Sequence, residues 1–404
     1  MAEQEFGRDH HNDFDMDSPE FNDNYYDVLN DLVTSCPVAH SKVGKGYHTI
    51  TGYEDVRRSA EDWPTFTSSK GFQPNRPDDM MKLIPVETDP PYHTIWRKVL
   101  NPFFTPGAAA KFESVVEEIV HGAIDDFIES GHTDFVRDVA VHLPSVMFFK
   151  TLIGVPMEDV EMLSTHVVAG LLGPVAERGA AWARCGDYVS DYLKTRAAQP
   201  PRNDVIDVVV QGFEYDGKET SFDEKVSVVV DLMSGGVGNT AYMLASIAHY
   251  LATHPDDRKV LVDDPQKISR AVDEFLRFYS PNFAIGRTCT RDVEISGTEL
   301  EEGDFVMLSW ATANRDPRMF SNPFEVDIER KHNRHIAFGV GPHRCLGSNI
   351  AKVQLRVTTR VLLERLPEFE VQPGTWPVWT TSLVREIEGL HLAFPPGQRR
   401  ASVR

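Results

Sequence analysis

One loop of this sequence gathers side chains that can do chemistry: Phe338-Gly339-Val340-Gly341-Pro342-His343-Arg344-Cys345-Leu346-Gly347. Cys345 stands just before a stretch, Ser348 to Leu366, whose apolar residues recur near helical spacing. At a helix N-terminus, unpaired N–H groups and the positive end of the helix dipole both favour a thiolate. The loop therefore predicts a sulfur that binds a metal or acts as a nucleophile.

The glycines of the loop indicate what the sulfur faces. Gly339 and Gly341 permit positive φ, so backbone amides can turn toward the sulfur. Gly347 leaves room for a flat group, and Phe338 can cover its face. The simpler alternative is a free core cysteine behind a glycine-rich turn.

The pattern F-G-x-G-x-H-x-C-x-G resembles the heme-binding loop of the cytochrome P450 superfamily and matches it at every specified position. The resemblance implies that Cys345 is the axial ligand of a heme b iron and that Phe338, Gly339, His343 and Gly347 contact the cofactor. A thiolate ligand pushes electron density toward iron and favours O–O cleavage, with O2 as cosubstrate.

A second basic group precedes this loop. Pro90-Pro91 begins a helix in which His93 and Arg97 are four residues apart and share a face, so together they can grip a carboxylate. Solvated surface capping is the alternative for such a pair. In the family this H-x-x-x-R element binds a heme propionate, and Arg287 matches another propionate contact.

The chain from Ser221 to Thr253 reads as one long buried helix. Ser221-Phe222-Asp223-Glu224 is a capping-box signature, and the residues after it are apolar almost all round. Gly235, Gly236 and Gly238 interrupt it, each weakening a helix by about 1 kcal/mol relative to alanine. The segment resembles the family's helix across the distal heme face, where Gly235 and Gly236 open a groove beside the cofactor.

This helix departs from the family at the catalytic positions. Gly238 stands where an acid is usual and Asn239 where an alcohol is usual, with Thr240 after them. An amide can donate a hydrogen bond but cannot pass on a proton as a hydroxyl can. Water beside Gly238 or a polar group of the substrate would complete the proton path. Asn239 and the run Asp273 to Tyr279 also resemble the bacterial branch that oxidises monoterpenoids.

The resemblance places a substrate pocket along four segments, with ordinary packing as the alternative for each residue. They are the irregular loop between Trp63 and Val86, the central helix, the strand after Pro281 and the loop before Gly389; the pocket candidates are Phe72, Met81, Met233, Phe283, Ala284, Ile285, Leu383 and Val384. His166 to Gly186 corresponds to the family's mobile lid.

A charge triad is expected to support the cysteine loop. Glu274 and Arg277 are three residues apart in a helical segment, a spacing that allows an ion pair. They match the family's E-x-x-R, and Arg330 matches the third member. The resemblance implies a buried, multiply bonded network.

Composition limits the class of protein. The chain has 404 residues, 41% of them hydrophobic, and a formal net charge of −20, which disfavours nucleic acid and anionic membranes as partners. Its four cysteines form no C-x-x-C pair, and no stretch of about 18 apolar residues or signal peptide is present. We expect a cytoplasmic monomer, with a flexible acidic tail over residues 1–24 and a single domain over 25–404. Its expected fold is mainly α with a small β region, the cytochrome P450 fold.

The resemblance implies a monooxygenase that inserts one oxygen atom from O2 into a small hydrophobic substrate, such as a terpenoid-, steroid- or aromatic-like compound. Electrons come from a separate ferredoxin or flavodoxin, since no Rossmann fingerprint follows a strand. Two alternatives stay open. One is an atypical heme-thiolate cycle, as in a peroxygenase or an isomerase, and the other is a non-enzymatic heme sensor.

Overall fold

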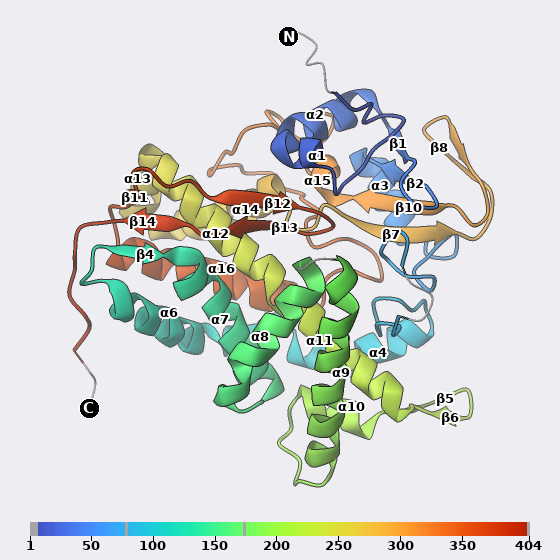
Figure 1. Ribbon diagram of the computed structural model, residues 1–404, viewed down its shortest axis with the longest axis horizontal. Helices are drawn as coiled ribbons and strands as arrows, with labels where there is room; N and C mark the ends of the chain where they lie inside the picture. Colours follow the sequence, from blue (N-terminus) through green and yellow to red (C-terminus); the bar gives the residue numbers. More distant parts are fainter. Residues whose placement is uncertain (1–6, 77–79, 173–174, 402–404) are drawn as a thin grey trace.

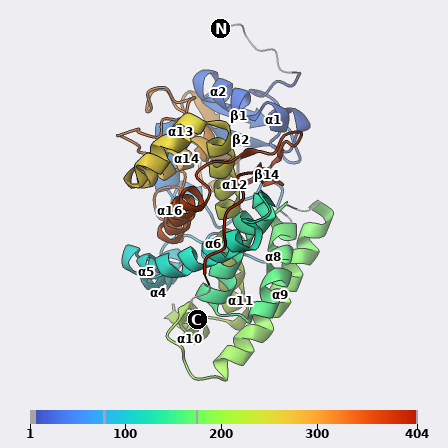
Figure 2. The ribbon, with the colours of Figure 1, turned by 90° about the vertical axis from the view of Figure 1, so that its left-hand side faces the viewer.

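The computed structural model describes residues 7–76, 80–172 and 175–401. A β-rich part that includes the N-terminal helices lies at one end, and a larger helical body lies at the other (Figure 1; Figure 2). This arrangement confirms the predicted mainly helical fold with a small β region. Residues 77–79 of the predicted pocket loop and 173–174 of the predicted lid lie outside the described residues.

The helices are α1 (Pro19–Asp23), α2 (Tyr25–Ser35), α3 (Tyr53–Glu61), α4 (Tyr92–Leu100), α5 (Pro106–Ala110), α6 (Glu113–Phe127), α7 (His142–Ser145), α8 (Met157–Leu172), α9 (Val175–Ala197), α10 (Val205–Gln211), α11 (Phe222–Gly236), α12 (Gly238–Thr253), α13 (Pro255–Asp263), α14 (Ile268–Tyr279), α15 (Trp310–Ala313) and α16 (Ser348–Arg365). Short 3-10 turns are η1 (Asn101–Phe103) and η4 (Pro265–Lys267), and π-helical segments are η2 (Val136–Val141) and η3 (Val146–Ile153).

The strands are β1 (Val38–Ser41), β2 (Tyr47–Ile50), β3 (Phe66–Thr67), β4 (His132–Asp134), β5 (Glu214–Tyr215), β6 (Lys218–Glu219), β7 (Ala284–Cys289), β8 (Val293–Ile295), β9 (Thr298–Leu300), β10 (Phe305–Ser309), β11 (Glu370–Val371), β12 (Val378–Thr381), β13 (Arg385–Glu388) and β14 (His391–Ala393). The main sheet has the order β1-β2-β10-β7-β3, in which β10 pairs parallel with β2 and antiparallel with β7. Side chains alternate across such a sheet, so β7 presents two faces to different surroundings.

The predicted long helix is two helices with a break at Val237, whose φ and ψ are −118° and −63°. The capping box at Ser221 and Glu224 is present as predicted. α12 packs against α7, α14, α16 and β13, so it lies at the centre of the helical body, while α11 continues beside α9 and α10. The break comes at the Gly-Gly-Val-Gly sequence, where low helix propensity makes an interruption least costly.

The N-terminal segment corrects a prediction. Residues 7–24, expected to be a flexible tail, contain helix α1, capped by the Ser18 side chain, and pack onto the main sheet. Phe14 and Phe21 are fully buried, and their rings lie 5.5 and 5.4 Å from the ring of Phe283. The acidic residues around Phe14 and Phe21 gave the segment the composition of a flexible tail, so its small apolar face was not predicted. Residues 1–6 of the predicted tail lie outside the described residues.

Among the described residues no single helix has the length and apolar composition to cross a membrane, and only the pair Val136–Ile153 and Met157–Gly170, bent by 119°, meets both when counted together. The pair contributes Val139, Phe149 and Leu163 to the main hydrophobic core. η3 ends at Gly154, which has a φ of 82°, and carries Phe148 toward α11.

Candidate heme-thiolate site

A cavity of about 290 Å³ opens beside Cys345 in the interior of the helical body. Its wall takes residues from α4, α11, α12, β7, the 338–347 loop and α16. Elements distant in the sequence therefore converge on one space, with the sulfur-bearing loop on one side and the α11–α12 break on another.

The loop holds Cys345 at the entrance of α16, as the sequence predicts. The Cys345 N–H donates to the Phe338 carbonyl at 2.8 Å, and Gly347 forms the N-cap of α16. Gly341 has a φ of 70°, and a Cβ there would lie 2.7 Å from the Ala60 carbonyl oxygen, so only glycine fits without displacement. Burial raises the pKa of the Cys345 thiol, whereas the N–H groups of Gly347 and Ser348 and the charges of Arg97 and Arg344 lower it.

Four basic side chains line the cavity next to this loop. Arg287, 3% exposed, and Arg97 form no ion pair within the part of the chain that the structure describes. The rings of His93 and His343 lie 4.1 Å apart, and the buried Nδ1 of His93 has no hydrogen-bond partner in that same part. Burial lowers the pKa of Arg287 to about 10 and, with Arg97 nearby, that of His93 to about 4. These donors lack an anion.

Helices α11 and α12 supply the opposite wall. Gly235 faces open space, because a Cβ added there would meet nothing within 4 Å, whereas a Cβ on Gly236 would overlap the Phe148 ring. Asn239 follows the break and lines the cavity, and its buried Oδ1 accepts no hydrogen bond from the described residues. The space beside this wall is thus narrow at Gly236 and open at Gly235, and the wall itself is polar at Asn239.

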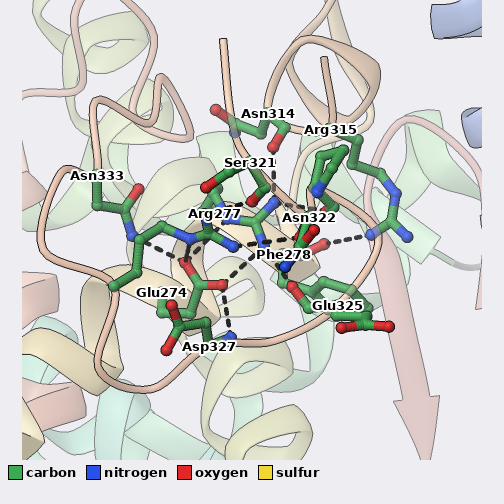
Figure 3. Close-up of polar contacts among 12 residues, drawn as sticks. Glu274, Arg277, Phe278, Asn314, Arg315, Ser321, Asn322, Glu325, Asp327 and Asn333 are labelled. Atoms are coloured by element: carbon green, nitrogen blue, oxygen red, sulfur yellow. Dashed lines mark hydrogen bonds and ion pairs between the residues drawn. The ribbon is translucent and has the colours of Figure 1, made fainter. Parts of the chain in front are cut away.

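The predicted triad forms a buried network, and Figure 3 shows Glu274 and Arg277 at its centre. Glu274, 0% exposed, accepts from Arg277 Nη2 at 2.7 Å and from Arg330 Nε at 2.8 Å. Asn333 Nδ2 donates to the same carboxylate at 3.0 Å. Arg277 also donates to the carbonyls of Asn314, Pro323 and Glu325. Every oxygen of Glu274 is satisfied, so the charges hold the chain before the loop in one arrangement.

Most predicted cofactor and catalytic residues meet at the cavity. Those that line it are His93, Arg97, Gly235, Gly236, Asn239, Thr240, Arg287, Phe338, Gly339, His343, Cys345 and Gly347, and of the predicted substrate-pocket residues Ile285 lines it too. Arg97 donates to the Arg344 carbonyl at 2.7 Å, which ties α4 to the cysteine loop.

Several predicted residues do not line the cavity, and their placement corrects the predicted pocket. Phe283 and Ala284 are buried in a second core, the apolar cluster that includes Phe14 and Phe21 of the N-terminal segment. Ala284 lies on the face of β7 opposite Ile285 and Arg287, which line the cavity, and Phe283 precedes the strand. Leu383 packs against this second core, and Val384 is bridged to Asn282.

The other corrections follow from helix and loop geometry. Met233 is buried in the main core, since it lies two residues from both Asp231 and Gly235 and so faces away from the wall that they form. Gly238 is buried at the start of α12. Met81 is 37% exposed, and Phe72 packs against the main core with its carbonyl accepting from Gly286.

Sequence reasoning missed several wall residues. They are Pro85, Val86, Phe104, Phe112, Met147, Phe148, Leu152, Asp231, Leu232, Pro281, Asn282, Trp310, Ala337, Val340, Leu346, Ile350, Ala351 and Gln354. Helical spacing was a usable signal for one of them, because Asp231 precedes Gly235 by four residues and Asn239 by eight. The aromatic residues of η3 and the 103–112 segment gave no local signal.

Comparison with known proteins identifies the class. The family model "Cytochrome P450" matches residues 266–389. The chain is 31% identical to a steroid C26-monooxygenase of Mycolicibacterium smegmatis over 359 residues, 87% of this chain and 88% of that protein. It is 33% identical to a vitamin D(3) 25-hydroxylase of Pseudonocardia autotrophica over 337 residues, covering 80% and 82% of the two chains.

A solved structure agrees with these relatives. The cytochrome P450 of the bacillaene polyketide synthase of Bacillus subtilis 168 superposes with a TM-score of 0.84 at 27% identity, covering 94% of this chain and 99% of that one. The chain therefore belongs to the cytochrome P450 family, and it is an oxidoreductase of the monooxygenase class, as predicted. The family implies the use of heme and O2.

The residues present fit a heme. A thiol faces the cavity at a helix N-terminus, which suits an iron ligand. The unpaired guanidiniums of Arg97 and Arg287 and the free Nδ1 of His93 are suited to carboxylates, which are the polar groups of that cofactor. Gly235, Gly339 and Gly347 meet nothing closer than 3.6 Å at a Cβ position, which leaves room for a flat ring.

Proposed function

We propose that this protein binds heme b through Cys345 and inserts one oxygen atom from O2 into a small hydrophobic substrate, with electrons from a separate ferredoxin or flavodoxin. The observation that carries the proposal is the convergence of Cys345, Arg97, Arg287 and His93 on one cavity whose basic groups lack an anion. When bound, the heme supplies O2 activation and oxygen transfer.

The chain's own residues then have separate tasks. Arg97 and Arg287 hold the carboxylates of the cofactor through charge-assisted hydrogen bonds, and His93 and His343 add imidazole donors. The N–H groups of Gly347 and Ser348 stabilise the negative sulfur of Cys345. The apolar side chains of Phe148 and Leu152, on η3 beside α11, exclude water from the substrate side.

Asn239 is proposed to position the water that delivers protons. Its Oδ1 is buried without a donor among the described residues, so a water at that atom would satisfy it. Its amide N–H groups remain available to donate into the cavity. Since Gly238 offers no carboxyl group, the proton path passes through water held by Asn239 rather than through an acid side chain.

The names of the relatives support a substrate class. The two relatives act on a steroid and on vitamin D(3), as their names state. We propose a rigid, mostly apolar compound of comparable chemistry for this chain, because its cavity wall is largely aromatic and aliphatic. The expected monomeric state, cytoplasmic location and single domain over residues 25–404 remain predictions.

A second candidate is a peroxide-driven cycle, which the Gly238-Asn239 pair favours over the usual acid and alcohol. Purified protein is reduced under CO, and the long-wavelength band for which the family is named is expected in the wild type and absent in Cys345→Ala. Turnover is then compared with ferredoxin, reductase and O2 against peroxide alone. If product forms only in the peroxide reaction, the peroxide-driven cycle replaces the monooxygenase proposal. If the wild type shows no thiolate band, both proposals are wrong.

A further inference from the structure

Among the described residues that line the cavity, Asp231 alone carries a carboxyl group, and the roles proposed above for the cysteine loop and for Asn239 do not involve it. Asp231 lies on α11, one helical turn before Gly235, and lines the cavity together with Val86 and Leu232. A carboxylate in a largely apolar wall is costly unless hydrogen-bond donors surround it. Its partners therefore indicate what it is for.

Asp231 is part-buried and has few hydrogen-bond partners. Oδ2 accepts from the Val86 N–H at 3.2 Å, and Oδ1 receives no hydrogen bond from any residue that the structure describes. No ion pair within 4.0 Å involves it in that part of the chain. Glu87 nearby accepts hydrogen bonds from Arg76 and the Leu83 N–H, and its carboxylate has no proton to donate to Asp231.

A role limited to fixing the 80–86 loop does not account for this arrangement. Ser227, one turn earlier on α11, already fixes that loop, since its Oγ accepts from the Ile84 N–H at 3.0 Å and donates to the Lys82 carbonyl. Asp231 adds one backbone contact and leaves an oxygen directed to no protein donor. Asp231 lines the cavity where the substrate would bind.

We propose that Asp231 is a specificity-determining residue that binds a hydroxyl group on an otherwise apolar substrate. The proposal deepens the proposed function by naming a polar group of its substrate. A hydroxyl donates to a carboxylate and accepts from a carboxylic acid, so it pairs with either form of the side chain. An ammonium group pairs only with the carboxylate and loses a strongly held hydration shell on entering the cavity.

The electrostatic setting agrees with a neutral ligand. Burial, with Glu87 adding repulsion, raises the pKa of Asp231 to about 7, while the Val86 N–H and Arg97 act in the opposite direction. Both protonation states are thus populated near neutral pH, and only a group that can donate and accept serves both.

The test compares three ligands with one skeleton: adamantane, 1-adamantanol and 1-adamantanamine. Their affinities for the ferric holoprotein are measured from the spin-state change or by competition, at pH 7. The wild type is expected to prefer the alcohol to the hydrocarbon. Asp231→Leu, similar in size but without a polar atom, should reduce that preference about 10- to 100-fold, the value of a hydrogen bond to a buried charged group. Asp231→Asn, which keeps an acceptor oxygen, should lose less.

Leu232→Val is the matched control, because it trims a neighbouring wall residue without removing a polar group. It should change the affinities for alcohol and hydrocarbon by the same factor. An unchanged ratio in Asp231→Leu, or no alcohol preference in the wild type, would overturn the proposal. The proposal would also be overturned if the wild type bound the amine more tightly than the alcohol and Asp231→Leu abolished this preference. These titrations use no electron donor, so their failure is distinct from a failure of the monooxygenase proposal.

Discussion

The ring of Phe148, on η3, occupies the space into which a Cβ on Gly236 of α11 would project. Phe148 is 7% exposed and also lines the cavity. Gly236 therefore lets η3 approach α11 closely. This close approach sets the width of the cavity just before the break at Val237.

Gly236→Ala is expected to lower the free energy of unfolding by about 1–3 kcal/mol, because the added methyl group overpacks against Phe148. Denaturant unfolding measures this cost. In a Phe148→Leu background the same change should cost at least about 1 kcal/mol less, since the two residues are in contact. Gly235→Ala is the control: nothing lies within 4 Å of its Cβ position, so stability should be retained. Equal costs in both backgrounds would contradict the contact.

Removing the charge of Glu274 should be among the most damaging single changes in the chain. Glu274→Gln leaves Arg277 and Arg330 buried with one fewer charge between them, and we expect a loss of about 3–5 kcal/mol in unfolding free energy. Heme content after purification should fall with it, because the network supports the cysteine loop. Asp263→Asn is the control, as its ion pair with Lys259 is exposed and should change stability by under about 0.5 kcal/mol.

Asp231 should make stability depend on pH. Its pKa of about 7 in the folded chain exceeds that of an unfolded aspartate, about 3.9. The folded state therefore holds this proton more tightly, and the contribution to stability is full below pH 4 and lost as pH rises from about 4 to 7. The free energy of unfolding of Asp231→Asn should therefore rise relative to that of the wild type as pH increases over this window. The expected rise is on the order of 2 kcal/mol, because solvent in the cavity screens part of the full effect. A constant difference between pH 4 and 8 would show that the carboxyl pKa is ordinary.

Asn239 should control the coupling of electron input to product. Asn239→Ala removes the buried Oδ1 that holds the proposed water, so hydrogen peroxide released per NAD(P)H consumed should rise severalfold. Ser246→Ala is the matched control, since Ser246 is buried on the same helix but does not line the cavity. Unchanged peroxide release in Asn239→Ala would remove the proposed role.

What the sequence could predict depended on how local the determinant was. The position of Cys345 at the start of α16 follows from glycines and helical spacing within about twenty residues, and the structure confirms it. The Glu274 network was predictable because its members match a motif. The break at Val237 was not, since three glycines lower helix propensity without stating where the backbone departs from helical geometry.

Strand β7 illustrates the harder case. Its alternation is clear in the sequence, but which face meets the cavity depends on what packs on the other side, and the composition of that partner indicates a flexible tail. Phe14 and Phe21 lie more than 250 residues before Phe283 in the chain, so no local pattern joins them. The misplacement of Phe283 and Ala284 and the expectation of a flexible tail have the same cause. The buried residues beside β7 and the N-terminal segment that covers them pack on each other, and neither could be recognised without the other.

Strand β7 also joins the cofactor site to the beginning of the chain. Arg287 lies on its cavity face, and Phe283, just before the strand, packs with Phe14 and Phe21. Any coupling free energy between the two faces acts equally in both directions, as thermodynamic linkage requires. With such a coupling, removal of the N-terminal segment up to residue 24 weakens the retention of heme, and loss of heme makes residues 7–24 easier for a protease to cut.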